Sequence, residues 1–217
     1  MTKIFLIAGM GADTRIYNNI EIPQNYDVIP LDWIEPDASD TLSTYSQKLI
    51  QQYNITYKSI VIGNSLGGMM AVEIAKLVPL SKVILISSIK TINEAPRYFS
   101  VFKMLPFYRI IPGKVFTLLG GFIRPVFGGM SPQQLWLFKD MLRKTSPTFL
   151  KWAMNAVLKW QNTVVPPNVY HITGDKDRVF NYRLIKDATI VKGGTHIMIF
   201  EKAKEINKIL KRILRTK

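Results

Sequence analysis

One stretch, from Lys58 to Ala75, restricts the fold of this chain more than any other. It opens with a β-branched apolar run over 60–62, which predicts a buried strand, and continues as Gly-Asn-Ser-Leu-Gly over 63–67 before a helical spacing of apolar residues begins. A G-x-S-x-G turn between a strand and a helix is typical of a nucleophile elbow, which raises a serine hydroxyl above a sheet. The alternative is a glycine-rich turn whose serine has no chemical role.

Apolar runs on both sides of this stretch predict further strands, about six in all. Helical patterns alternate with them, ending at about Gln52 and before Pro79, and the last one predicts a single helix over Phe200–Leu214 with one apolar stripe. Continuous apolar strands that alternate with helices favour an α/β fold with a doubly wound, mostly parallel sheet. Pro30 places the second strand near a sheet edge or at its own end. The additional strands are expected at 3–8, 26–31, 82–87, 169–173 and 188–191.

The alternation breaks between about residues 90 and 165. This segment shows no convincing strand, is helical in pattern, and carries six prolines among many aromatic and methionine side chains. The chain of 217 residues is long enough for one α/β domain with such an insertion. We therefore predict a core formed by residues 1–89 and 166–217, with residues 90–165 inserted between them.

Composition excludes several classes of protein. The chain has no cysteine, which rules out disulfides and thiolate metal sites and permits a reducing compartment. Residues 1–10 predict a first strand and not a signal peptide, and no uninterrupted apolar run reaches about 20 residues. We therefore expect a cytoplasmic protein without a membrane-spanning helix.

The net charge of +14 is unevenly distributed. Residues 90–165 carry +9 of it and residues 166–217 carry +7, whereas residues 1–89 have a net charge of −2. No nucleic-acid-binding motif accompanies the basic residues, so no nucleic-acid partner is expected. The charge indicates either a solvated lysine-rich exterior or a basic, apolar surface facing anionic lipid or an acidic substrate.

Four candidate groups each follow a predicted strand directly: Gly9-Met10, Ser65, Asp177 and His196. Because the carboxyl ends of parallel strands lie along one edge of a sheet, we expect these groups to converge there. Serine is a poor nucleophile at neutral pH without a base within hydrogen-bond reach. His196, in a glycine-rich loop, is the candidate base, whereas His171 lies inside a predicted strand and is expected to be packed.

The base needs a carboxylate to orient it, and an oxyanion needs donors. Asp177 is preferred as the carboxylate because it lies three residues past Gly174, far enough to curl back, while Asp175 fits a turn. The backbone N–H groups of Leu66 and Met10 are the expected oxyanion donors. Two alternatives for Gly9-Met10-Gly11 are a plain turn between a strand and a helix, and a phosphate-binding loop. The phosphate-binding motifs need a further glycine or a lysine at fixed spacing, and this chain has neither there.

With these residues identified, the chain resembles the serine hydrolases of the α/β-hydrolase fold, a superfamily of esterases, lipases and thioesterases. The resemblance covers about residues 3–90 and 166–215. It implies Ser65 as nucleophile, Asp177 as acid and His196 as base, and residues 90–165 as a helical lid. The motifs that carry it are I-A-G-M-G-A-D, V-I-G-N-S-L-G-G-M-M-A, I-T-G-D-K-D and K-G-G-T-H.

The chain also departs from the family in two respects. Ala8-Gly9 stands where His-Gly is common, which bears on the oxyanion geometry. The two antiparallel strands with which many members begin are missing, so we expect a compact core of about six strands.

The apolar lid favours a small ester or thioester with a hydrophobic acyl or alcohol portion as substrate. Most of its aromatic side chains are expected to pack within the lid and onto the sheet. Serine, histidine and aspartate suffice for acyl transfer, so no cofactor or metal is required. Two other hypotheses remain. One is a catalytically silent binding protein of the hydrolase fold, and the other is a membrane-surface protein that binds lipid through its basic, aromatic lid, with hydrolysis secondary.

Overall fold

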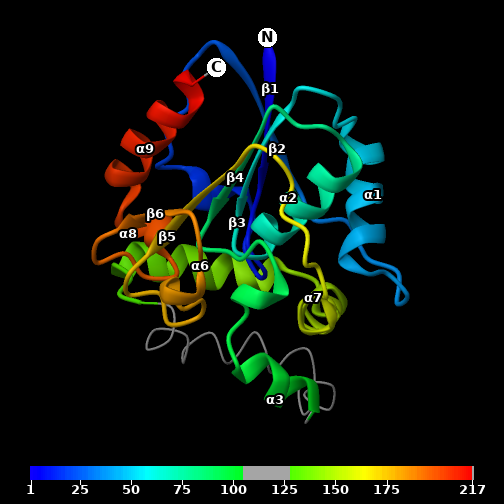
Figure 1. The fold of residues 1–217 in the computed structure, drawn as a ribbon. Coiled ribbons are helices and arrows are strands. Elements are labelled where there is room, and N and C mark those ends of the chain that lie inside the picture. Colours follow the sequence, from blue (N-terminus) through cyan, green and yellow to red (C-terminus); the bar gives the residue numbers. More distant parts are fainter. Residues whose placement is uncertain (105–127, 217) are drawn as a thin grey trace.

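A parallel sheet forms the centre of the computed structural model, which describes residues 1–104 and 128–216 (Figure 1). Among these residues there are six strands in the order β2-β1-β3-β4-β5-β6, and every neighbouring pair is parallel. Pro30 lies in β2 at the edge of the sheet. The predicted fold is therefore confirmed. The strands are β1 (Thr2–Ile7), β2 (Tyr26–Leu31), β3 (Ile60–Asn64), β4 (Lys82–Ile86), β5 (Val169–Gly174) and β6 (Ala188–Val191).

The strand order places the reversal of the winding between β1 and β3. The chain first moves outward from β1 to β2, then returns to β3 on the other side of β1 and continues in that direction to β6. In open α/β sheets, sites lie beyond the carboxyl ends of the strands at such a reversal. The loop after β1 and the turn after β3, which carry Met10 and Ser65, occupy this position.

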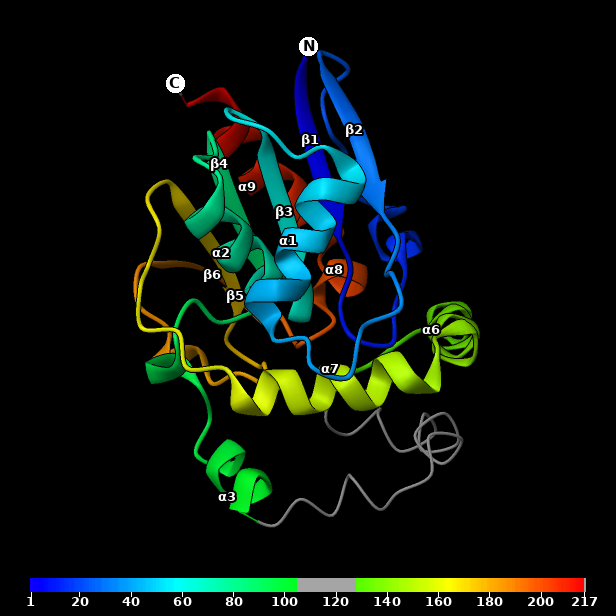
Figure 2. The same cartoon turned by 90° about the vertical axis from the view of Figure 1, so that its right-hand side faces the viewer.

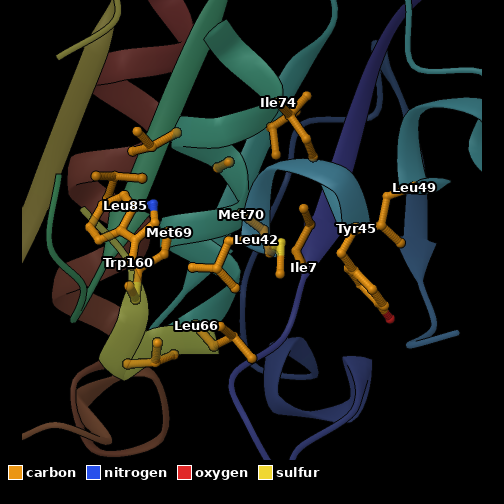
Figure 3. Close-up of a cluster of buried hydrophobic side chains, with 14 of the residues drawn as sticks. Ile7, Leu42, Tyr45, Leu49, Leu66, Met69, Met70, Ile74, Leu85 and Trp160 are labelled. Atoms are coloured by element: carbon orange, nitrogen blue, oxygen red, sulfur yellow. The ribbon is translucent and has the colours of Figure 1, made fainter. Parts of the chain in front are cut away.

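Helices cover both faces of the sheet (Figure 2). On one face lie α1 (Leu42–Tyr53) and α2 (Leu66–Leu77), whose apolar side chains form one hydrophobic core with alternate strand residues. Figure 3 shows part of this core, including Tyr45, Met70 and Trp160. The opposite face is covered by the 3₁₀ helix η1 (Thr14–Tyr17), α8 (Met198–Glu201) and α9 (Ala203–Arg215).

The C-terminal helix differs from its prediction. One helix was expected over Phe200–Leu214, but two helices, α8 and α9, are separated at Lys202, whose φ of −122° and ψ of 28° are not helical. The break lets two short apolar faces reach the same core. Phe200 packs there from α8, while Ile206 and Leu210 pack from α9. The single apolar stripe did not reveal this change of direction.

The described part of the insertion is helical and contains no strand, as expected. It comprises the 3₁₀ helix η2 (Ile92–Glu94) and the helices α3 (Tyr98–Met104), α6 (Pro132–Lys144) and α7 (Pro147–Lys159). Ser131 and Ser146 cap α6 and α7, each followed by a proline at the first helical position. The expected lid residues Leu105, Phe107, Tyr108, Val115, Phe116, Leu118, Leu119, Phe122, Val126 and Phe127 lie outside the described residues.

Both α6 and α7 lie at the carboxyl edge of the sheet (Figure 2). Side-chain contacts attach them to the core: Arg15 Nη1 of η1 donates to Asp140 Oδ2 of α6 at 2.8 Å, and Trp152 Nε1 of α7 donates to the carbonyl oxygen of Asp40 at 2.8 Å. Phe149 and Trp152 also belong to the core that α1 and α2 share. No helix within 1–104 or 128–216 has the length and apolar character needed to cross a bilayer.

Candidate active site

Ser65 lies at a tight turn between β3 and α2. Its φ of 52° and ψ of −116° are strained for a non-glycine residue. The turn closes because two glycines allow it: a Cβ on Gly63 would collide with the carbonyl of Gly67, and a Cβ on Gly67 would collide with that of Ile7. The N–H of Ser65 donates to the carbonyl oxygen of Ile86 at 3.0 Å, which anchors the turn to β4. This is the geometry of a nucleophile elbow.

The structure brings His196 and Asp177 to this serine. His196 Nε2 lies 3.0 Å from Ser65 Oγ, and His196 Nδ1 lies 3.0 Å from Asp177 Oδ2. The imidazole and the carboxylate are both buried. Because an ionised carboxylate only accepts, the proton of a neutral His196 belongs on Nδ1, and Nε2 then accepts the hydroxyl proton of Ser65.

The other oxygen of Asp177 explains why this carboxylate is fixed. Asp177 Oδ1 accepts from the backbone N–H groups of Val179 at 2.8 Å and Phe180 at 2.9 Å. These two hydrogen bonds fold the segment 177–180 back onto the carboxylate. Asp175 is not brought into the set. Its Oδ1 accepts from the N–H of Gly193 at 2.6 Å, so this carboxylate holds a turn, as expected.

The loop that carries His196 is supported from two sides. Thr195 Oγ1 donates to Glu201 Oε2 of α8 at 2.6 Å. The ring of Phe180 packs edge-on against the imidazole with 5.4 Å between ring centroids. Neither Glu201 nor Phe180 was identified from the sequence. Phe180 follows Asp177 by three residues, and an apolar side chain this close to a candidate site residue was the signal that could have indicated it.

A small recess of about 30 Å³ adjoins Ser65. Met10 and His196 are among its lining residues, and most of its wall is apolar. Leu66 is the first residue of α2, so its N–H has no acceptor within the helix and is free to bind a ligand. Met10 lines the recess together with Ser65, and Leu66 follows the serine directly in the chain, so both residues expected to supply oxyanion donors lie near it. The recess is lined by Gly9, Met10, Ala12, Ile16, Asn64, Ser65, Phe138, His196, Ile197, Ile199 and Phe200.

His171 lies in β5, 2% exposed, and is packed as predicted. Its Nε2 lies 3.0 Å from the carbonyl oxygen of Ser88, and its Nδ1 lies 3.4 Å from Lys90 Nζ. Burial, followed by the neighbouring Lys90 ammonium, lowers the pKa of His171 to about 3. The ring is therefore neutral near pH 7. Sequence reasoning missed its partners Ser88 and Lys90, although polar residues directly after an apolar strand were a signal.

The pKa of His171 predicts a specific pH dependence of stability. In the unfolded chain a histidine has a pKa of about 6.5. Below that pH the His171 imidazole binds a proton in the unfolded state but stays neutral in the folded state. The free energy of unfolding falls as the pH drops from about 6.5 towards 3, by about 2 kcal/mol from this group at pH 5. Urea unfolding at pH 7.5 and pH 5.0 measures the change.

The variant His171→Gln is the comparison for that measurement, because glutamine does not titrate. Its loss of stability between the two pH values should be about 2 kcal/mol smaller than that of the native protein. Equal losses in both proteins would show that His171 does not resist protonation in the folded state.

Within the described ranges, no group of three or more histidine, cysteine, aspartate or glutamate residues has an arrangement that could hold a metal ion. The side chains that the structure brings together at Ser65 are a serine, a histidine and a carboxylate. Such a set can perform acyl transfer by itself.

Both the sequence and the fold are similar to those of known proteins. Its sequence matches the model described as "Alpha/beta hydrolase family" over residues 6–209. No curated protein sequence matches it. A solved structure of a thermophilic esterase from Thermogutta terrifontis is 14% identical, with a TM-score of 0.76 over 99% of this chain and 90% of that one.

Two further solved structures have a similar fold. A hydrolase from Oleispira antarctica is 15% identical, with a TM-score of 0.77 over 100% of this chain and 92% of that one. A bromoperoxidase from Bacillus anthracis is 18% identical, with a TM-score of 0.73 over 99% and 92%. At these identities the likeness concerns the fold alone.

Proposed function

The chain belongs to the alpha/beta hydrolase family, and from that membership we propose that it is a serine hydrolase acting on a carboxylic ester or thioester. The observation that carries the proposal is the hydrogen-bonded series from Ser65 Oγ through His196 to Asp177, with 3.0 Å at both steps. A silent binding protein of this fold would have no need to keep all three groups in contact.

In the proposed mechanism, Ser65 Oγ attacks the substrate carbonyl while His196 Nε2 takes the hydroxyl proton. The backbone N–H groups of Met10 and Leu66 donate to the oxyanion, and Asp177 stabilises the imidazolium. Collapse of the tetrahedral species expels the alcohol or thiol, which receives the proton from His196. A water that gives its proton to His196 then attacks the acyl-enzyme, and Ser65 regains its proton as the acid leaves.

The proposed substrate carries an apolar portion. The side chains of Phe138, Ile199 and Phe200 form part of the recess beside Ser65, and none of the three is polar. The insertion helices α6 and α7 lie at the same edge of the sheet (Figure 2), and we propose that residues 90–165 act as a lid over the site. Two of the proteins of similar fold are described as an esterase and a bromoperoxidase, so the fold does not select the reaction.

A series of p-nitrophenyl esters tests the substrate class. We expect kcat/KM to rise by roughly 15-fold from the acetate to the butyrate and again from the butyrate to the hexanoate, because each step buries two methylenes worth about 0.8 kcal/mol each. The matched thioesters, assayed by thiol release, distinguish the two leaving groups. Turnover that is highest on the acetate and undetectable on longer chains would contradict an apolar pocket.

An anionic lipid surface is the second candidate partner, and α3 is the feature that favours it. This helix has no buried residue, and Val101, Phe102 and Met104 are 53%, 49% and 76% exposed, with Lys103 among them. Apolar side chains beside a cation are typical of helices that lie in a membrane interface.

Cosedimentation with vesicles tests this second candidate. We expect more native protein to bind vesicles that contain phosphatidylserine than vesicles of phosphatidylcholine alone, and the Phe102→Ser, Met104→Ser double variant to bind several-fold less. Binding that is independent of anionic lipid, or unchanged in the variant, would exclude α3 as a lipid contact.

A further inference from the structure

A second set of buried polar side chains lies next to Ser65 and has no part in the proposed mechanism. Ser88, Lys90, Glu94 and His171 are 0%, 5%, 5% and 2% exposed. A buried ion pair costs more in lost hydration than it returns unless its geometry and its other hydrogen bonds are good. The stability of this set therefore depends on how completely its charged and polar atoms are paired.

The charged end of the set is a closed ion pair. Lys90 Nζ lies 2.9 Å from Glu94 Oε1, and the backbone N–H of Lys90 donates to Glu94 Oε2 at 2.7 Å. The Lys90 ammonium also donates to the carbonyl oxygen of Lys186 and lies 3.4 Å from His171 Nδ1. Because an ammonium only donates, Nδ1 is the acceptor and the ring proton of His171 belongs on Nε2.

From His171 the contacts continue to the nucleophile. His171 Nε2 lies 3.0 Å from the carbonyl oxygen of Ser88 and donates to it in this tautomer. Ser88 Oγ donates to the carbonyl oxygen of Ser65 at 2.6 Å. A Cβ on Gly68 would collide with Ser88 Oγ, so the first turn of α2 has room for this hydroxyl only because residue 68 is glycine.

The segment 86–88 consequently holds Ser65 at both of its peptide groups. The N–H of Ser65 donates to the carbonyl oxygen of Ile86, and its own carbonyl accepts from Ser88. Ser65 is strained at φ 52°, and Ser87 inside the supporting segment is strained at φ 48°. Strained backbone persists only where the surroundings hold it in place, and at Ser65 they include the carbonyl of Ile86, the N–H of Gly68 and the hydroxyl of Ser88, whose own carbonyl contacts His171.

We propose that Ser88 and His171 are positioning residues for the nucleophile. The series from Glu94 through Lys90 and His171 to Ser88 fixes the peptide of Ser65, and with it the direction of the hydroxyl that His196 must meet. This inference rests on the proposed function, in which Ser65 Oγ attacks the substrate. A loss of positioning should lower the rate of attack and leave substrate binding nearly unchanged.

Two pairs of variants test the inference. Ser88→Ala is matched by Ser46→Ala, since Ser46 is also 0% exposed and its hydroxyl also donates to a backbone carbonyl, that of Leu42 at 2.8 Å. His171→Gln is matched by His171→Leu, since glutamine keeps a donor for Ser88 and an acceptor for Lys90 and leucine keeps neither. The readouts are kcat and KM on a p-nitrophenyl ester, the rate of fluorophosphonate labelling of Ser65, and thermal unfolding.

We expect Ser88→Ala and His171→Leu to lower kcat and the labelling rate roughly tenfold with KM within about twofold. Ser46→Ala should match the native protein, and His171→Gln should recover most of the loss. Equal rates in Ser88→Ala and Ser46→Ala would overturn the inference alone, as would a glutamine variant no faster than the leucine one. If His171→Leu does not fold, the comparison of Ser88→Ala with Ser46→Ala still tests the inference. A native protein that is neither labelled nor active would overturn the proposed function, and the inference with it.

Discussion

Replacing Ser65 by alanine is expected to lower turnover of a p-nitrophenyl ester by roughly four to six orders of magnitude. The substitution removes the atom that forms the acyl-enzyme, and His196 Nε2 then has no hydroxyl proton to take. The free energy of unfolding should change by less than about 1 kcal/mol, because alanine occupies the same strained backbone and loses only one hydroxyl. Steady-state kinetics and thermal unfolding of the purified variant measure the two effects.

The outcome that contradicts this assignment is a folded Ser65→Ala protein with turnover near that of the native protein. An inactive variant that is also unfolded would not count, which is why the unfolding measurement accompanies the kinetics. Ser46→Ala serves as the control here too, because Ser46 lies in α1 and its hydroxyl bonds to the carbonyl of Leu42.

Asp177→Asn is expected to have the second largest effect, a fall in kcat of roughly 10²- to 10⁴-fold. The asparagine oxygen can still accept the N–H groups of Val179 and Phe180, so its NH₂ group must face His196 Nδ1. The asparagine NH₂ and the Nδ1–H of His196 would then be two donors facing each other, unless the imidazole carries its proton on Nε2 instead. In that tautomer Nε2 no longer accepts the proton of Ser65, so the nucleophile is not activated.

Asp175→Asn is the matched control, since it makes the same chemical change two residues away. Its carboxylate contacts the N–H of Gly193 and not the imidazole, so kcat should stay within a few-fold of the native value. Equal losses in the two variants would mean that the acid has been assigned to the wrong residue or that its loop is merely structural.

Most of the core could be predicted from the sequence, because strands buried on both faces are continuous apolar runs. β4, buried at all five of its positions, spans Lys82–Ile86, where its apolar run predicts a strand over 82–87. Ser65, Asp177 and His196 could be found because each follows a strand, and parallel strands bring their carboxyl ends to one edge. These are local patterns that the fold then combines.

The features that escaped prediction depend on contacts between distant parts of the chain. Lys90 is an ordinary surface lysine in sequence terms, and only its approach to His171, 81 residues later, shows that it is buried. Likewise, the break at Lys202 depends on how α8 and α9 meet the sheet, which the shared apolar spacing of both helices conceals. The division of the chain into a core and a 90–165 lid stays a prediction.

Fluorophosphonate labelling followed by peptide mapping tests most directly whether Ser65 is the nucleophile. These reagents react with a serine only when a base activates it, so the test needs no knowledge of the natural substrate. The native protein should carry a single adduct, on Ser65, that is absent from Ser65→Ala and forms much more slowly in Asp177→Asn than in Asp175→Asn. A folded native protein that carries no adduct, or carries it on another residue, would contradict the proposed mechanism.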